Sequence, residues 1–140
     1  MTRVDFYSNA PDKLDLARLI IYKAYKQGLS VIVHSTDPPT LSDLDQRLWA
    51  EPATSFLPHC RTDAVHAANT PVLLNANSDT LNHTADVLIN LNATTPGFFS
   101  RFERVVEIVS TNEADKDAAR QRWIFYKQRG YAMTNHDMRK

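Results

Sequence analysis

The sequence predicts an α/β fold in three layers, with a mostly parallel sheet of about five strands flanked by helices. Apolar runs at residues 31–33 and 72–74 are continuous, which is typical of strands buried on both faces. Segments with helical spacing of apolar residues separate several of these runs, and strands that alternate with helices form parallel sheets. The length fits one domain, so residues 1–140 are expected to fold as a single unit.

The first elements follow from local signals. A short first strand ends at Ser8 and Asn9, either of which can cap the helix that begins at Pro11. This helix is expected to stop at Gly28, because glycine readily adopts the left-handed conformation that follows a helix. The buried strand at residues 31–33 comes directly after it.

The second helix is predicted over residues 40–50, with the sequence TLSDLDQRLWA. Thr40 and Asp43 resemble a capping box, and Pro38 and Pro39 are expected to keep the preceding loop non-helical. Three leucines have the spacing of one core-facing stripe: Leu41, Leu44 and Leu48.

Apolar runs predict three later strands at residues 72–74, 87–91 and 105–109. Asn112 is expected to cap a last helix that runs through Arg129 and ends at Gly130.

Charge and composition narrow the class of partner. Lys plus Arg and Asp plus Glu number 16 each, so no net field attracts nucleic acid phosphates. Residues 101–140 nevertheless carry 9 basic and 6 acidic side chains, which favours an acidic partner. The single cysteine, Cys60, excludes an internal disulfide and fits a reducing compartment. No apolar run reaches the length of a signal peptide or a membrane span, so a cytoplasmic protein without membrane contact is expected.

Glycine usage argues against a nucleotide site. Nucleotide phosphates bind α/β sheets at Gly-rich first turns, whereas the first turn here, FYSNAPDK, has no glycine. The chain contains only Gly28, Gly97 and Gly130, and neither G-x-G-x-x-G nor a P-loop can be built from them. We therefore expect no nucleotide-binding loop and no cofactor.

The best enzymatic alternative is a metal- or Cys60-dependent hydrolase built on His59, Cys60, Asp63 and His66. A cysteine flanked by histidines can act as a thiolate nucleophile or as a metal ligand. The spacing matches no common zinc site, which uses about four ligands, so polar loop surface is the simpler interpretation. His34 follows a strand at the end where active sites collect, but no base partner accompanies it in the sequence.

Residues 48–59, LWAEPATSFLPH, combine two large aromatic side chains and two prolines with almost no charge. Pro52 ends the preceding helix and forces Glu51 out of the α region. Trp49 lies about 100° around the helix from the leucine stripe and is expected to face outward. Two interpretations are open: Trp49 and Phe56 close the edge of the core, or they form a docking surface.

The last helix has a basic face around an aromatic ring, at positions i, i+4, i+7 and i+11: Lys116, Arg120, Trp123 and Lys127. Ala118 and Phe125 lie roughly opposite and are expected near the strand-facing side. Cations around a ring suit an acidic peptide that ends in an aromatic residue. Two alternatives are open. Trp123 belongs to the core and the basic side chains beside it are solvated, or this face of the helix stacks the bases of single-stranded nucleic acid.

Five segments together resemble the chi subunit of bacterial DNA polymerase III holoenzyme: DFYS, LDQRLWAEPATSFLPH, DVLINLN, ERVVEIV and ARQRWIFYKQRGY. The most specific is the block LWAxPAxSFxPH. The resemblance implies a non-catalytic accessory subunit of the clamp loader, with a Rossmann-like sheet that has no nucleotide loop. It also implies three partners: the psi subunit, the acidic-aromatic C-terminal tail of single-stranded DNA-binding protein, and a DinG-like helicase. DNA would then be reached only indirectly.

The resemblance also assigns roles to residues by motif position. The surface for psi or the helicase is matched to Trp49, Phe56, Leu48 and Pro52. The tail site is matched to Val109, Lys116, Arg120, Trp123 and Lys127. Two positions depart from the family pattern, because Trp123 stands where tyrosine is typical and Ile124 where a basic residue is frequent.

Overall fold

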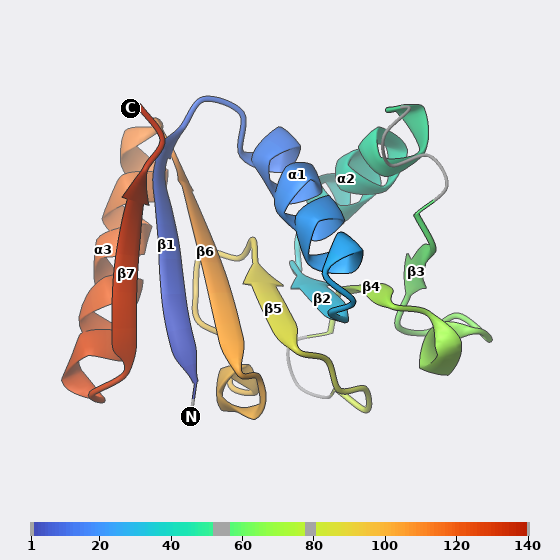
Figure 1. Cartoon of the computed structure of the whole chain (residues 1–140). Helices are drawn as coiled ribbons and strands as arrows, with labels where there is room; N and C mark the ends of the chain where they lie inside the picture. Colours follow the sequence, from blue (N-terminus) through green and yellow to red (C-terminus); the bar gives the residue numbers. More distant parts are fainter. Residues whose placement is uncertain (1, 52–56, 78–80, 140) are drawn as a thin grey trace.

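The computed structural model describes residues 2–51, 57–77 and 81–139. Within these residues, seven strands form one sheet in the order β3-β4-β2-β5-β6-β1-β7, and neighbouring strands run parallel (Figure 1). The strands are β1 (Arg3–Ala10), β2 (Val31–His34), β3 (His59–Arg61), β4 (Val72–Asn75), β5 (Val87–Asn90), β6 (Arg104–Ser110) and β7 (Ala132–Asp137). The helices are α1 (Lys13–Lys26), α2 (Pro38–Ala50) and α3 (Glu113–Gln128), with short 3-10 turns η1 (Ala67–Asn69) and η2 (Phe99–Arg101). The predicted α/β class is confirmed.

The two edge strands, β3 and β7, account for the difference from the roughly five strands that the sequence predicts. β3 has only 3 residues, and β7 has the mostly polar sequence AMTNHD with no buried residue. Neither has the apolar pattern of a strand, and each is defined by pairing with a longer neighbour, β4 and β1 respectively. Short and polar edge strands are a common way to prevent sheets from pairing with one another.

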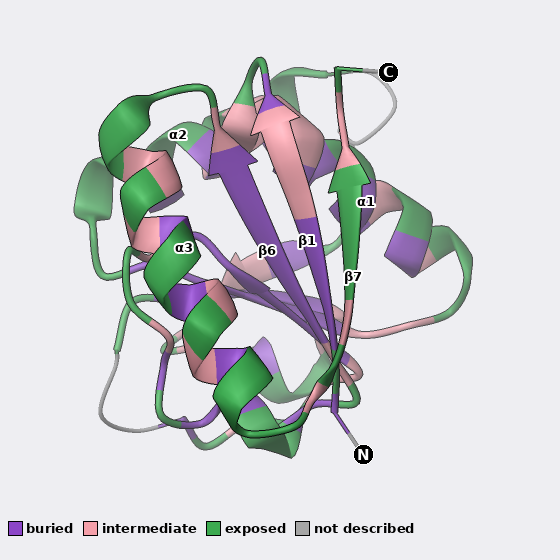
Figure 2. Ribbon diagram, turned by 90° about the vertical axis from the view of Figure 1, so that its left-hand side faces the viewer, coloured by how far each residue is buried: buried purple, intermediate pink, exposed green. Residues whose placement is uncertain are grey.

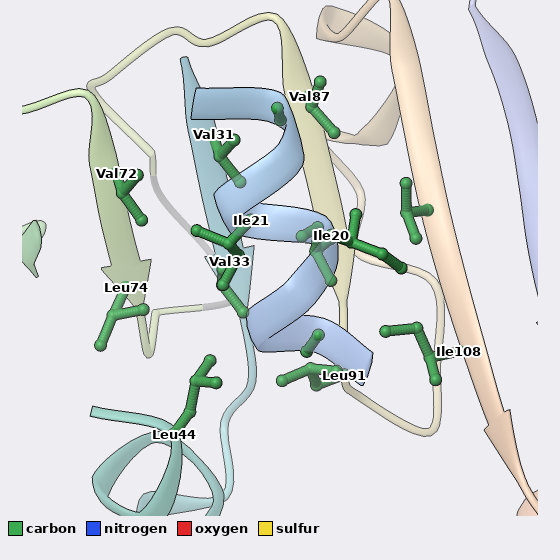
Figure 3. Packing of buried hydrophobic residues seen from close by; sticks show 14 of the residues in the cluster. Ile20, Ile21, Val31, Val33, Leu44, Val72, Leu74, Val87, Leu91 and Ile108 are labelled. Carbon is green, nitrogen blue, oxygen red and sulfur yellow. The ribbon is translucent and has the colours of Figure 1, made fainter. Parts of the chain in front are cut away.

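Helices cover both faces of the sheet, with α1 and α2 on one face and α3 on the other (Figure 1). Figure 3 shows Ile21 of α1 packed over Val31 and Val33 of β2, with Ile20 directed toward β5. Ile32, between these two valines, belongs to the cluster under α3. The central strands are therefore buried on both faces, which is why their apolar runs are continuous.

The start of α1 differs from the sequence prediction. β1 continues to Ala10, so neither Ser8 nor Asn9 caps the helix. The cap is Asp12, whose carboxylate accepts a hydrogen bond from the Asp15 N–H at 3.2 Å. Aspartate at this position satisfies an N–H group that the helix leaves without an intrahelical partner.

The start of α2 also differs. The helix begins at Pro38, with Asp37 as its N-cap residue and proline in the first turn. Proline suits that position because its missing N–H has no intrahelical acceptor there. Thr40 lies inside the helix and its hydroxyl donates to Asp37 at 2.5 Å, so the predicted capping box beginning at Thr40 is wrong.

Other helix ends agree with the sequence predictions. Glu51 has extended backbone (φ −83°, ψ 127°), and the Asn112 side chain caps α3 by accepting from the Asp115 N–H. Gly28 and Gly130 both have positive φ, at 80° and 77°. Glycine is favoured at both positions because a Cβ is strained in that region.

The buried face of α3 consists of Ala119, Arg122 and Tyr126 (Figure 2). The expectation that Ala118 and Phe125 mark the strand-facing side is wrong, because both are only half-buried. Because one of the three buried residues is Arg122, the pattern of apolar residues alone does not reveal the buried side of α3.

Candidate functional site

A pocket of about 470 Å³ lies between α3 and the carboxyl ends of β1, β6 and β7. Its lining residues are Phe6, Ser8, Asn9, Val109, Lys116, Ala119, Arg120, Trp123, Asn135 and Arg139. Four of the five residues matched to the tail site by resemblance therefore line one pocket. Val109 reaches it from the end of β6, while the other three project from α3.

The pocket has an apolar floor around Trp123. The indole ring meets the ring of Phe6 edge to face, with 5.1 Å between centroids, and Val109 and Ala119 beside it are buried. Trp123 itself is half-buried. It therefore packs against the core with one part of the ring and lines the pocket with another.

Two cations on α3 border this floor. Lys116 Nζ lies 3.7 Å from Glu113 Oε1, and the Arg120 guanidinium donates a hydrogen bond to the Asp117 carboxylate. Both are i,i+3 pairs within the helix, and the Arg120 pair is well exposed, so each contributes little to stability. Lys127 is exposed farther along α3 and does not line the pocket. The sequence pattern placed it on the same face, which is correct, but the pocket ends before it.

The opposite wall comes from β1 and β7 and was missed by sequence reasoning. Asn9, in the left-handed region (φ 57°), donates from Nδ2 to Asp137 Oδ1 at 3.2 Å. Arg139 donates to the same carboxylate from Nε at 3.1 Å and from Nη2 at 2.7 Å. These hydrogen bonds, those from Arg139 first, hold the pKa of Asp137 below its ordinary value. Only the surplus of basic residues after residue 100 hinted at this wall.

The start of α3 is fixed by Asp115. Its carboxylate accepts the Ser110 N–H at 2.8 Å and the Lys13 ammonium at 3.2 Å. Partial burial raises the pKa of Asp115, but the Ser110 N–H and Lys13 outweigh it, so the pKa lies below its ordinary value. The ionised carboxylate thus joins α1, β6 and the first turn of α3, where a negative charge also favours the helix dipole.

A second exposed feature is Trp49 near the end of α2, on the side of the sheet away from α3 (Figure 1). It is 57% exposed, as predicted. Its ring packs on the buried ring of His59, with 4.6 Å between centroids. His59 is held by the Leu57 carbonyl at 2.8 Å and by Asp45 at 3.0 Å. The indole is therefore supported from below and open to solvent above.

The other residues matched to this surface have different outcomes. Leu48 is fully buried with Leu41 and Leu44, so it supports the surface from within the core and does not offer a contact to a partner. Pro52 and Phe56 lie outside the described residues. Of the four residues matched to this surface, Trp49 is therefore the one that the structure describes as exposed.

The proposed hydrolase cluster is not assembled. Of its members, His59 contacts Asp45 and Leu57, Cys60 is half-buried in β3, and Asp63 and His66 are exposed. Among residues 2–51, 57–77 and 81–139, no group of three His, Cys, Asp or Glu side chains is placed to hold a metal ion. No specific geometry therefore favours the hydrolase alternative.

His34 is a core residue at the end of β2. Its ring is fully buried, contacts Phe98 edge to face at 5.1 Å, and lies 3.2 Å from the Asn75 amide nitrogen. Burial lowers the pKa of His34 below its ordinary value, with an opposing contribution from Asn75.

In the described part of the chain, no helix is both long and apolar enough to cross a lipid bilayer.

Comparison with known proteins matches residues 1–134 to the family described as "DNA polymerase III chi subunit, HolC". A DNA polymerase III subunit chi from Pseudomonas aeruginosa is 38% identical, over 97% of this chain and 96% of the relative. The subunit chi of Escherichia coli is 29% identical, over 80% of this chain and 76% of the relative.

Among solved structures, the C-terminal domain of a Saccharomyces cerevisiae Dbp5 variant superposes with a TM-score of 0.65. The alignment covers 98% of this chain and 90% of that domain at 10% identity, so it supports the fold alone. The family match spans nearly the whole sequence, including β1, α2 and all of α3. This chain therefore belongs to the chi subunit family of DNA polymerase III, an accessory subunit in DNA replication.

Proposed function

We propose that this chi subunit is a non-catalytic adaptor that joins single-stranded DNA-binding protein to the clamp loader through the psi subunit. The observation that carries the proposal is the pocket in which Lys116 and Arg120 border the apolar floor at Trp123. The acidic, aromatic-ended C-terminal tail of single-stranded DNA-binding protein has the matching chemistry. Its terminal ring packs on Trp123, and its carboxylates bind the cations.

Arg120 can exchange its ion pair with Asp117 for one with a carboxylate of the tail. Arg120 and Asp117 are both largely exposed, and a pair of this kind is worth at most about 1 kcal/mol. A tail carboxylate beside the apolar floor replaces Asp117 at small cost. It is also partly desolvated there, which strengthens a charge-assisted hydrogen bond.

The psi subunit binds the surface around Trp49. Exposed tryptophan side chains are enriched among the residues that dominate interface energetics. The ring is held in place by His59 and Asp45, so little conformational entropy is lost when a partner covers it. A DinG-like helicase competes for the same surface.

Trp49 packs on His59 of β3, at one edge of the sheet, whereas the tail pocket, lined by Lys116, Arg120 and Trp123, lies beside β1 and β7 at the other edge. The helices that carry them, α2 and α3, cover opposite faces of the sheet (Figure 1). One partner therefore leaves room for the other, which is the geometric requirement of a bridge. The net charge of the chain is zero, so DNA is contacted through single-stranded DNA-binding protein and not by the chain's own field.

Titration of a fluorescent peptide with the cognate tail sequence tests the tail site. We expect Arg120→Ala to weaken binding by about 1.5–3 kcal/mol, the usual worth of a hydrogen bond to a charged group. Lys23→Ala removes an exposed cation of α1 on the other face, and we expect it to leave tail affinity unchanged. Binding to psi should be the same for both variants. Equal losses of tail and psi binding in Arg120→Ala, or no binding of the tail by the unmodified chain, would refute the proposal.

A further inference from the structure

Arg139 lines the tail pocket on the wall opposite α3, and the family resemblance assigns it no role. It follows β7, one of the two strands that the sequence did not predict. The pocket therefore has cations on two walls: Lys116 and Arg120 on the helix, and Arg139 on the C-terminal segment.

The segment that carries Arg139 is fixed to β1. The Met138 N–H donates to the Ser8 carbonyl at 2.9 Å, which extends the pairing of β1 with β7. Asp137 then holds the arginine: its Oδ1 accepts from the Arg139 backbone N–H at 3.0 Å, and its two oxygens accept from the guanidinium. Asn9 anchors the same carboxylate from the end of β1. Arg139 is thus positioned by the fold although its side chain is 69% exposed.

The guanidinium keeps binding capacity in this arrangement. Asp137 uses Nε and Nη2, and among the described residues Nη1 makes no hydrogen bond. Arginine has five N–H donors in a rigid fork. A second carboxylate can therefore bind at the Nη1 edge without displacing Asp137.

The two walls separate the two kinds of carboxylate in the tail. The terminal carboxylate belongs to the same residue as the aromatic ring, so it stays close to Trp123 and to Arg120, which lies one turn away on the same helix face. Asn9 and Arg139 form the wall across the pocket from the cations of α3, so a peptide that leaves the pocket on that side carries the residues before its terminal aromatic past Arg139. Their acidic side chains then meet the C-terminal segment.

We propose that Arg139 is a specificity residue that binds an acidic side chain upstream of the terminal aromatic residue, while the cations of α3 bind the terminal carboxylate. This inference rests on the proposed function, because it says which part of the same tail binds which wall of the same pocket. The Arg139 side chain is exposed and its backbone contacts are kept by alanine, so Arg139→Ala should fold with unchanged circular dichroism and melting temperature.

The test is a double-mutant cycle by fluorescence anisotropy with three synthetic peptides. One has the cognate tail sequence, one has its acidic side chains replaced by their amides, and one has an amidated C-terminus. We expect Arg139→Ala to weaken binding of the cognate peptide about ten- to a hundredfold, the range that follows from the loss of one hydrogen bond to a charged group. The loss should disappear with the side-chain amide peptide and persist with the C-terminally amidated one. Arg120→Ala should show the reverse dependence.

The outcomes separate the two proposals. If Arg120→Ala weakens binding but Arg139→Ala does not, the tail site stands and the role of Arg139 is overturned. If Arg139→Ala loses the same factor with the cognate and the side-chain amide peptides, its contact is with another group, which also overturns the inference. If the unmodified chain binds no tail peptide, the proposed function fails and this inference fails with it. Lys23→Ala serves as the charge-matched control throughout.

Discussion

Glu107 on β6 and Arg122 on α3 form an ion pair with 2.9 Å between Oε1 and Nε, and their side chains are 0% and 2% exposed. The carboxylate also accepts hydrogen bonds from the Tyr126 hydroxyl at 2.7 Å and from the Asn90 amide at 3.0 Å. Arg122 donates to the Ala93 carbonyl as well. This network joins α3 to the sheet directly beneath the helix that carries the tail pocket.

The first prediction concerns this pair. Arg122→Leu leaves the Glu107 carboxylate buried without its cation, so we expect the free energy of unfolding to fall by about 3–5 kcal/mol. Urea denaturation measures the change. Gln121→Leu alters an exposed neighbour on the same helix, and its effect should stay within about 0.5 kcal/mol. A loss below about 1 kcal/mol in Arg122→Leu would contradict a structural role for the pair.

The second prediction separates two adjacent residues of α2. Leu48 is fully buried and Trp49 is exposed. Leu48→Ala should lower stability by about 2–5 kcal/mol through the cavity it leaves, whereas Trp49→Ala should cost about 1 kcal/mol or less, the worth of its contact with His59.

Binding of psi should show the opposite order. Trp49→Ala should weaken it by about 2 kcal/mol or more, while Leu48→Ala retains it at temperatures where the chain is folded. Calorimetric titration with psi and thermal melts measure the two effects. Leu19→Ala, at an exposed leucine of α1, is the control for non-specific loss of apolar surface. Normal psi binding by Trp49→Ala would mean that the partner docks elsewhere.

The third prediction is a pH dependence at Asp115. Its pKa is lower in the folded chain than its ordinary value of 3.8, so the folded state holds the proton more weakly than the unfolded state. The stability it contributes is present above about pH 4 and is lost as the pH falls from there through the folded pKa. Asp115→Asn should therefore be less stable than the unmodified chain by about 1–2 kcal/mol at pH 7.

The difference between the two proteins should shrink below pH 4, where the unmodified carboxylate takes up its proton. Urea denaturation at several pH values between 7 and 3 follows it. Asp117→Asn, which changes an exposed carboxylate two residues farther along the same helix, is the matched control and should show a smaller difference. A gap for Asp115→Asn that stays constant across this range would show that the ionised form is not what stabilises the start of α3.

Several features follow from the sequence because their causes are local. Apolar runs predict four of the strands, β2, β4, β5 and β6, since each needs apolar partners on both faces wherever it lies, and Val4 and Phe6 predict β1. Gly28 and Gly130 mark helix ends because left-handed backbone is a property of the residue itself. The exposure of Trp49 follows from its angle to the leucine stripe, and the spacing of Arg120 and Trp123 places both on one face of α3.

The tertiary structure decides what depends on residues far apart in the chain. β3 and β7 have no apolar pattern and exist because a longer strand offers free N–H and C=O groups beside them. Arg122 faces inward because Glu107, Asn90 and the Ala93 carbonyl meet it there. The second wall of the tail pocket forms only when β7 pairs with β1 and brings Arg139 opposite α3. The sequence alone thus determined the three helices, the five inner strands and one face of the site, whereas long-range pairing added the two edge strands and decided which polar groups are buried and which cations share a pocket.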